Sequence, residues 1–258
     1  ILSIKVKVIS LMAAAVLTAC GGSDDGSTNN PVGPNGAAEG VYGGLAADGN
    51  AVRWVILEDN KIYGFLDDTP TSAFMVDRLI YGTGSSSNGS YNTTNAKIYT
   101  ATEPPANASI TLSKTSATAI SGTATDAIGP VKFNAGPVAG STYSYDTPAK
   151  LEDIAGSWSL SSSDGTTTGI PLVVGTFTAS PPGSTICFIT GKIVPRPSGK
   201  NIFNTNATFG AGCGPNAGSK TTGIGIVFPL ASGGAQVLFA DVDSSSGAGS
   251  ASFGTRGD

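Results

Sequence analysis

The chain has 258 residues with a formal net charge of −4, only 12% charged residues and 36 glycines. This acidic balance argues against nucleic-acid binding, which needs a basic surface. The sequence contains no histidine, which removes the commonest metal ligand and general base and every nucleophile that a histidine activates.

The first 19 residues have the pattern of an export signal. Lys5 and Lys7 precede an apolar run, Val8–Leu17, that a single serine interrupts. A transmembrane helix needs roughly 20 apolar residues, so this shorter run fits a cleaved signal peptide over residues 1–19. An ordinary buried helix is the alternative, but the composition turns polar immediately after this segment.

The segment ends in Leu17-Thr18-Ala19-Cys20, which resembles the lipobox of bacterial lipoproteins. The resemblance implies cleavage before Cys20 and attachment of acyl chains such as palmitate to that cysteine. Several acyl chains hold a protein on a membrane firmly, whereas one chain binds only marginally. Because Gly21 stands where inner-membrane lipoproteins have an aspartate, the resemblance also implies the outer membrane of a Gram-negative bacterium. It leaves the periplasmic and cell-surface faces equally open.

Residues 20–39 follow as a tether. They are rich in Gly, Ser, Asn, Asp and Pro and have almost nothing to bury, which is typical of a flexible linker. From residue 40 onward, short apolar runs alternate with turn residues, so we expect a first β-module over residues 40–146 and a second over residues 147–258.

The first module has its clearest strands at Val52–Leu57 and Lys61–Leu66, joined by the three-residue loop 58–60. Asn88-Gly89 is expected to form a turn inside a loop over residues 84–89. The other strands expected in this module are 79–82, 97–100, 109–112, 119–125 and 131–134.

A single helical turn is expected at the junction of the modules. Thr147 is a suitable N-cap, Pro148 suits the first helical position, and Gly156 suits the end. In the second module, Ala231-Ser232-Gly233-Gly234 predicts a hairpin between its last long strands. The strands expected there are 172–178, 185–194, 202–209, 224–230, 235–242 and 250–256.

This pattern predicts an all-β fold of two tandem antiparallel meanders, each a small barrel or a strongly curled sheet, with a sandwich as the alternative. An ungapped coincidence at an offset of 116 residues supports the tandem arrangement. Gly40 and Tyr42 correspond to Gly156 and Trp158, and Asp48-Gly49 corresponds to Asp164-Gly165. We therefore expect Tyr42 and Trp158 to be buried at equivalent places, with a groove between the modules as the natural site for a partner.

Two cysteines remain once Cys20 is assigned to lipid. In an exported protein, Cys187 and Cys213 are expected to form a disulfide, and two buried free thiols are the alternative. Folding the flanking strands together sets residue 187 opposite roughly residue 209, so the segment 210–212 has to bring the sulfurs together.

The acidic residues do not form a recognisable site. Asp241-Val242-Asp243-Ser244-Ser245 begins like a calcium loop, but the glycine falls one place late and Ser252 stands where a glutamate is needed. A solvated strand end is the expected structure. Glu58-Asp59 and Asp67-Asp68 are adjacent pairs in turns, so their side chains are expected to diverge rather than face a substrate. No metal, cofactor or catalytic residue is expected.

Aromatic residues recur about once per strand, and most are expected in the core. A minority at a barrel mouth would make a ligand site. The aromatic residues concerned are Tyr42, Trp54, Tyr63, Phe65, Trp158, Phe177, Phe188, Phe203, Phe209, Phe228 and Phe239.

A lipidated, acidic, Gly/Ser-rich chain with tandem β-modules loosely resembles the surface lipoproteins of Gram-negative bacteria that include transferrin-binding protein B and factor H-binding protein. We therefore expect a non-enzymatic lipoprotein, anchored to the membrane through Cys20, that binds a protein or a small ligand. A structural envelope spacer is the alternative. A carboxylate-dependent hydrolase is a more distant alternative, which would need a concave cluster of two or more acidic side chains.

Overall fold

The computed structural model describes residues 38–68, 70, 74–163, 167–172, 175–180, 184–243 and 247–256. The predicted signal peptide, Cys20 and most of the predicted tether lie outside these residues. Within these ranges no helix has the length and apolar character needed to cross a bilayer. Both β-sheets belong to one compact unit that begins at Gly33, so the division predicted after residue 146 stays a prediction.

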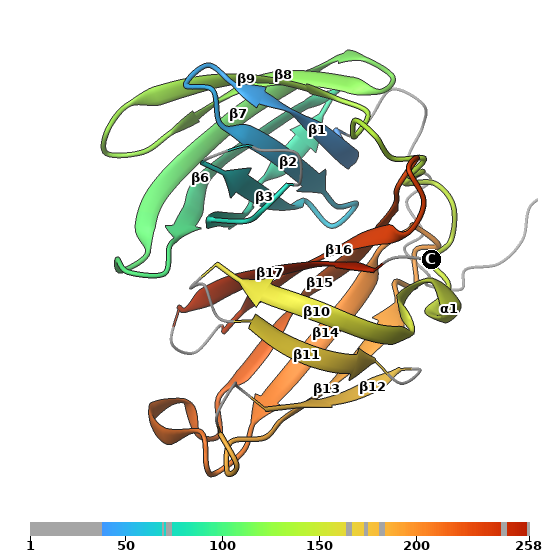
Figure 1. The fold of residues 1–258 in the computed structure, drawn as a ribbon. Helices are drawn as coiled ribbons and strands as arrows, with labels where there is room; N and C mark the ends of the chain where they lie inside the picture. Colours follow the sequence, from blue (N-terminus) through green and yellow to red (C-terminus); the bar gives the residue numbers. More distant parts are fainter. Residues whose placement is uncertain are drawn as a thin grey trace, which may run out of the picture. The chain divides into compact units, whose positions relative to one another are not determined.

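The first sheet is an up-and-down antiparallel barrel (Figure 1). Pairing of β9 with β1 and of β4 with β6 closes a circuit of eight strands, and the short β5 pairs with β6 beyond the end of β4. The strands are β1 (Gly40–Ala46), β2 (Ala51–Ile56), β3 (Lys61–Asp67), β4 (Arg78–Thr83), β5 (Ser85–Ser87), β6 (Ser90–Tyr99), β7 (Ala106–Ser116), β8 (Ala119–Thr125) and β9 (Pro130–Gly136).

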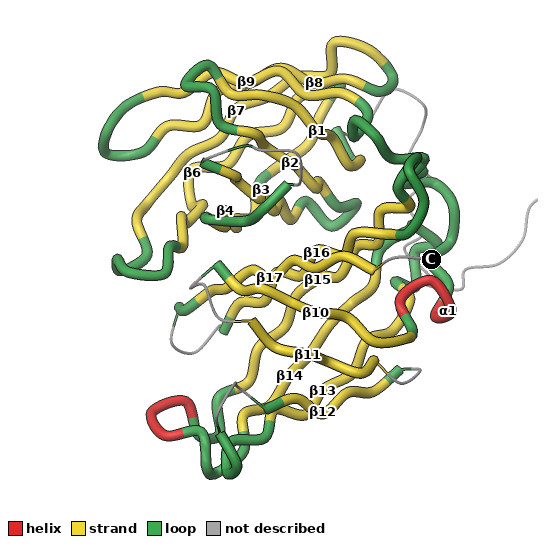
Figure 2. Tube along the Cα trace, viewed as in Figure 1, coloured by secondary structure: helices red, strands yellow, loops and turns green. Residues whose placement is uncertain are grey.

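The second sheet is an open counterpart of the barrel. Its order is β11-β10-β17-β16-β15-β14-β13-β12, and among the described residues no ladder joins β11 to β12. Strands account for most of both modules (Figure 2), which confirms the all-β prediction of two tandem meanders. The elements are α1 (Leu151–Ile154), β10 (Gly156–Ser162), β11 (Thr167–Leu172), β12 (Thr176–Ala179), β13 (Ile189–Pro195), β14 (Phe203–Phe209), η1 (Gly214–Asn216), β15 (Lys220–Pro229), β16 (Ala235–Val242) and β17 (Gly249–Arg256).

The two modules share one strand register at the predicted offset. Tyr42 on β1 faces Trp54 on β2, and Trp158 on β10 faces Ile170 on β11. The turn expected at residues 48–49 is present, with Gly49 at a φ of 92°. Its counterpart at residues 164–165 lies outside the described residues. The repeated register means that residues of the two interiors can be compared position by position.

The leading aromatic residue of each module is anchored in the same way. Tyr42 is 3% exposed, and its hydroxyl lies 3.1 Å from the carbonyl oxygen of Ala38 and 2.9 Å from that of Glu39, to which it donates. Trp158 is 2% exposed and donates its indole N–H to the carbonyl oxygen of Ile154 at 2.8 Å. The acceptors stand three or four residues upstream, so a buried polar group is satisfied locally in both modules. The prediction of equivalent buried positions is confirmed.

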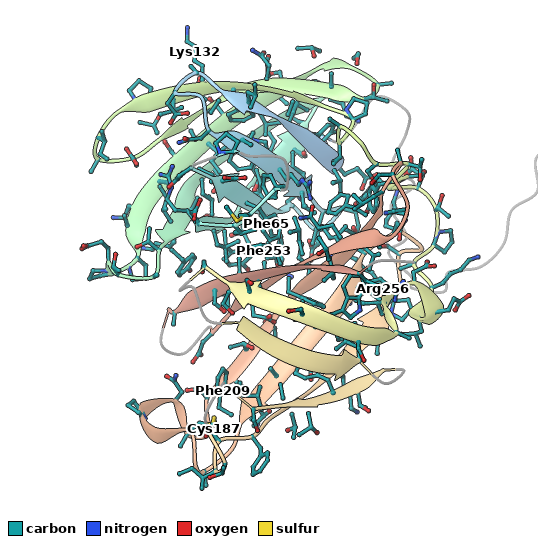
Figure 3. The ribbon with its side chains drawn as sticks, in the orientation of Figure 1. Phe65, Lys132, Cys187, Phe209, Phe253 and Arg256 are labelled. Carbon is teal, nitrogen blue, oxygen red and sulfur yellow. A yellow bond between two sulfur atoms is a disulfide. The ribbon has the colours of Figure 1, made fainter. Side chains whose placement is uncertain are left out.

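An apolar interface joins the modules where the sequence predicted a groove. The outward faces of β2, β3 and β4 pack against those of β15, β16 and β17 in one buried cluster. Figure 3 shows Phe65 of β3 and Phe253 of β17 on the facing sides of the two sheets. A partner therefore has no open groove between these strands, because the side chains of the two sheets fill it.

A buried arginine bonds across this interface. The guanidinium of Arg53 on β2 lies 4.1 Å from the ring centre of Phe74 and 4.7 Å from that of Phe228 on β15. It donates to the side-chain oxygen of Gln236 on β16. The Gln236 amide in turn donates to the carbonyl oxygen of Phe74 at 2.7 Å. Burial lowers the pKa of Arg53 to about 10, which leaves it charged at neutral pH.

The acidic pair Glu58-Asp59 converges on one cation, contrary to the prediction that these side chains diverge. The Nε of Arg196 from the second module lies 2.7 Å from Glu58 Oε1, and its Nη2 lies 3.0 Å from Asp59 Oδ2. The planar guanidinium can bind two carboxylates at once, so a turn that looks solvated in sequence becomes a contact between the modules.

The helix differs from its prediction. Residue 150, not Thr147, precedes it, and α1 is four residues long with no side-chain cap. Lys150, directly before it, is extended, and the N–H of Ala149 donates to the carbonyl oxygen of Lys200 at 3.3 Å. Attachment of this segment to the second module therefore replaces the helical turn that Pro148 was expected to start.

Strand boundaries differ where local geometry interrupts an apolar run. The strand predicted over 172–178 is two strands, because Gly175 has a φ of 81° that breaks the extended chain. The strand predicted from residue 185 begins at Ile189, since the Ser184 hydroxyl accepts the N–H of Cys187 at 2.9 Å and holds a turn. Part of the loop predicted over 84–89 forms β5.

Truncation of Trp158, the leading aromatic residue of the second module, tests how much this side chain contributes to the free energy of unfolding. We expect Trp158→Ala to lower the free energy of unfolding by about 3–5 kcal/mol because it leaves a large buried cavity. Trp158→Phe, which keeps a ring and loses the bond to Ile154, should cost clearly less. Urea unfolding followed by circular dichroism measures both, and equal costs for the two variants would contradict this account.

Candidate functional site

A cavity of about 490 Å³ lies inside the second module. Its wall is apolar over most of its area, with Leu160, Leu172 and Ile193 among its residues and the rings of Phe177 and Phe239 beside them. Thr100 and Ala101, from the loop after β6 of the first module, also line it. An apolar wall with a few polar groups is typical of small-molecule sites.

The strand register shows which side chains differ between the two interiors, including Phe239 opposite Ser252 where the first barrel has Gly122 opposite Phe133. In the first barrel, the rings of Trp54 and Phe133 lie 4.7 Å apart in the core. Phe133 on β9 pairs with Ala46, and Ser162, which stands 116 residues after Ala46, pairs with Ser252 on β17. A hydroxymethyl group thus stands where the first module has a phenyl ring.

The strands next to β9 and β17 differ in the same way at positions that the strand pairing makes equivalent. Ile110 of β7 pairs with Ala124 of β8 in the first barrel, and Gly223 of β15 pairs with Asp241 of β16 in the second. The second module therefore has a glycine in place of an isoleucine and a carboxyl group in place of a methyl group. A pocket beside Trp54 and Phe133 in the first barrel has a volume of about 50 Å³.

Asp241 places a carboxyl group in this wall. The hydroxyl of Thr205 on β14 donates to Asp241 Oδ1 at 2.8 Å. Burial raises the pKa of Asp241 to about 6, and the Thr205 hydrogen bond partly opposes this shift. The prediction of a solvated strand end is wrong, because the neighbouring strands β15 and β17 enclose the end of β16. Asp241 itself is half-buried, and Asp243, two residues further on, is buried.

The aromatic residues form two groups, one in the buried clusters and a smaller one that lines the cavity, and the sequence did not predict which residues belong to which group. Phe177, Phe209 and Phe239 line the cavity, whereas Trp54 and Tyr63 belong to buried clusters. Phe188 is 51% exposed and belongs to neither group. The offset of 116 residues holds for the first two strands of each module but does not lead to Gly223 or Ser252, so only the strand pairing identifies these small residues.

The described lining holds one carboxyl group, Asp241. Hydrolysis by paired carboxylates needs two such groups across a substrate. Among the described residues, no group of three or more Asp, Glu and Cys side chains is placed to hold a metal ion. The described wall of the cavity therefore combines apolar side chains with one carboxyl group, that of Asp241.

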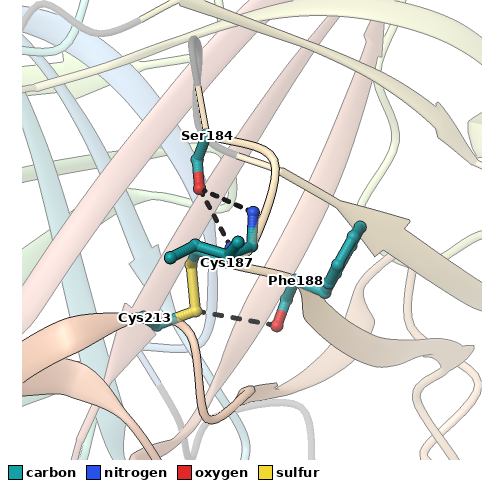
Figure 4. Close-up of a disulfide and its surroundings, with 5 residues drawn as sticks. Ser184, Cys187, Phe188 and Cys213 are labelled. Carbon is teal, nitrogen blue, oxygen red and sulfur yellow. Dashed lines mark hydrogen bonds between the residues drawn. A yellow bond between two sulfur atoms is a disulfide. The ribbon is translucent and has the colours of Figure 1, made fainter.

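Cys187 and Cys213 form the predicted disulfide, with their Cα atoms 4.4 Å apart (Figure 4). The strand register pairs Ile189 with Phe209, so residue 187 stands nearer to Cys213 than the sequence predicted. At Gly212 a Cβ would collide with the carbonyl oxygen of Ile186, which explains the need for glycine. Ile189 and Phe209 both line the cavity. The disulfide therefore links the chain before β13 to the chain after β14, next to the cavity wall.

No protein-family model matches the sequence, and no curated protein matches it. Among solved structures, the crystal structure of a protein of unknown function from the DUF3598 family of Nostoc punctiforme is similar at 10% sequence identity. The match covers 84% of this chain and 94% of that one, with a TM-score of 0.27. A TM-score this low supports no conclusion about the function of this chain.

Loss of the disulfide should weaken the second module. The bridge closes a loop with a sequence separation of 26, so Cys187→Ala with Cys213→Ala should lower the free energy of unfolding by about 3.5 kcal/mol in the loop-entropy model. Urea unfolding measures the loss. Mass spectrometry after alkylation without reduction tests the bond itself, and two alkylated cysteines at these positions would rule it out.

The buried carboxyl group should make stability depend on pH. Its pKa is about 6 in the folded protein against 3.8 for an ordinary aspartate, so the folded state binds the proton more tightly. Stability from this group is present below pH 4 and is lost as the pH rises through 6. At pH 7.5, Asp241→Asn should therefore be more stable than the wild type by about 1–3 kcal/mol.

The difference between the variant and the wild type should vanish near pH 4, where both side chains are neutral. Glu103→Gln, at an exposed carboxylate, is the matched control and should show no such difference. Thermal or urea unfolding at both pH values measures it. A wild type that is more stable than Asp241→Asn at pH 7.5 would contradict the assigned environment.

Proposed function

We propose that the protein is a non-catalytic binding protein of the bacterial cell envelope, anchored to the outer membrane through lipid on Cys20. Its second module takes a small, mainly apolar ligand. The observation that carries this proposal is the cavity of about 490 Å³ inside one of two modules that share a register. Its volume lies within the roughly 300–1,000 Å³ of small-molecule sites.

A cavity of this kind needs a reason, because protein interiors are usually close-packed. The first module shows that the same framework can be filled with Trp54, Phe133 and Ile110. The second module has Gly223 and Ser252 at the last two of these positions. A bound ligand would supply the apolar contacts that are missing beside Gly223 and Ser252, which would account for small residues at these positions.

A structural spacer is the competing function. A spacer needs only stable modules, and a filled interior such as that of the first barrel serves it best. The cavity and the enclosed carboxyl group of Asp241 both reduce stability, so they favour a binding function over a spacer.

The anchoring part of the proposal rests on the sequence. The lipobox-like segment Leu17-Thr18-Ala19-Cys20 and the polar residues 20–39 would hold the two modules near the membrane by a flexible tether. A binding site in this position can receive an apolar molecule directly from a membrane or from the space around it.

Filling the cavity should abolish binding. We expect Ser252→Phe, which restores the ring that Phe133 supplies in the first barrel, to lower the affinity for the neutral apolar dye N-phenyl-1-naphthylamine at least about ten-fold. The added ring occupies the space in which the dye would be buried. Dye fluorescence measures the affinity, and circular dichroism checks the fold.

Thr255→Phe adds the same ring at an exposed position of β17 and is the matched control, which should bind the dye as the wild type does. If the wild type does not bind the dye, or if Ser252→Phe binds it equally well, the cavity is not a ligand site.

Lipid attachment is tested in cells. Metabolic labelling with a fatty-acid analogue should mark the wild type and the Cys187→Ala Cys213→Ala variant alike, and should leave Cys20→Ala unmarked, because the label is attached to the cysteine of the lipobox. Label that persists in Cys20→Ala would refute the anchor.

A further inference from the structure

Charge distinguishes the cavity from a simple apolar container. Among the described residues that line it, Asp241 is the charged one, and no lysine or arginine is present. The Thr205 hydroxyl binds Oδ1 of this carboxyl group. Within the described chain, no ion pair involves Asp241, so its charge has no counter-ion.

An uncompensated carboxylate decides which ligands fit. A carboxylate or phosphate on the ligand would meet a like charge in an apolar setting, where repulsion is strong. A cation would supply the missing counter-ion and a charge-assisted hydrogen bond. The net charge of the protein, −4, favours the approach of the same cations.

We propose that the ligand is a small amine with an apolar body, whose ammonium group pairs with Asp241 inside the second module. This inference rests on the proposed binding function. An ammonium group has three N–H donors, and the hydroxyls of Ser250 and Ser252 line the same wall on β17. The body of the ligand would lie against the rings of Phe177 and Phe239.

Asp241 is the ionisable group of the described cavity wall whose protonation would change the binding of an ammonium group. Burial raises the pKa of Tyr63, on the facing strand of the first module, so that phenol stays neutral. Lys192 on β13 and Lys220 on β15 are exposed and alternate with residues that line the cavity. Asp243 lies two residues along the chain. Protonation of Asp241 at acidic pH would remove the partner of the ammonium group.

Three probes of similar shape test the charge preference on the full chain by titration calorimetry at pH 7.5. They are 2-phenylethylamine, which is cationic, 2-phenylethanol, which is neutral, and phenylacetate, which is anionic. We expect the amine to bind at least about ten-fold more tightly than the alcohol and phenylacetate to bind most weakly. In Asp241→Asn this preference should disappear. In Glu103→Gln, which removes an exposed carboxylate near Thr100 and Ala101, it should remain.

A second measurement needs no variant. Between pH 7.5 and pH 5 the amine stays protonated while Asp241 gains a proton, because burial raises the pKa of Asp241 to about 6. The affinity of the wild type for 2-phenylethylamine should therefore fall several-fold, and its affinity for 2-phenylethanol should stay constant.

The outcomes separate this inference from the proposed function. Binding of the alcohol or phenylacetate as tight as that of the amine, or an amine preference that survives in Asp241→Asn, overturns the charge pairing. If such binding is lost in Ser252→Phe, the cavity is still a ligand site. Failure of all three probes at millimolar concentration overturns the inference. Retained dye binding would then leave the proposed function standing, whereas loss of dye binding as well would overturn both.

Discussion

Burial of both faces of β15, β16 and β17 is the constraint on which the second module depends. The outward side chains, such as Ile224 and Leu238, pack against the first module, while the inward ones, Phe239 and Asp241, line the cavity. Since side chains alternate along a strand, a slip of one residue would put a carboxyl group into the apolar interface and Ala240 into the cavity. The contact between the modules therefore fixes which residues form the site, although it lies on the other side of the sheet.

The same framework serves two purposes in one chain. Closure between β4 and β6 and a full interior give the first barrel a stable core, and that core supplies the surface on which the second sheet packs. The second sheet can then hold an open interior and an enclosed carboxyl group at some cost in stability. Arg53 and Arg196 add polar bonds across the contact, so the stable module supports the one with the cavity.

Much of the architecture follows from the sequence, because turn residues and alternating apolar positions are local signals. The bounds of β8 and β16 agree with prediction, as do the disulfide and the repeated aromatic position. The site was missed for a physical reason. Asp241 looks solvated because its neighbours in sequence are polar, and only the strands that pair with it, distant in sequence, enclose it. The predicted helical turn is present but starts later, at Leu151, and a hydrogen bond from Ala149 to Lys200 ties the chain near Pro148 to the second module instead.

The central claim is that two modules with one register differ in their interiors, one filled and the other hollow. A crystal structure of the protein under xenon pressure tests it most directly, because xenon enters apolar cavities large enough to hold it. The account predicts xenon in the second module, between Phe177 and Phe239, and none beside Trp54 and Phe133 in the first barrel. A second module without xenon, with its side chains packed across the space next to Ser252, would contradict it.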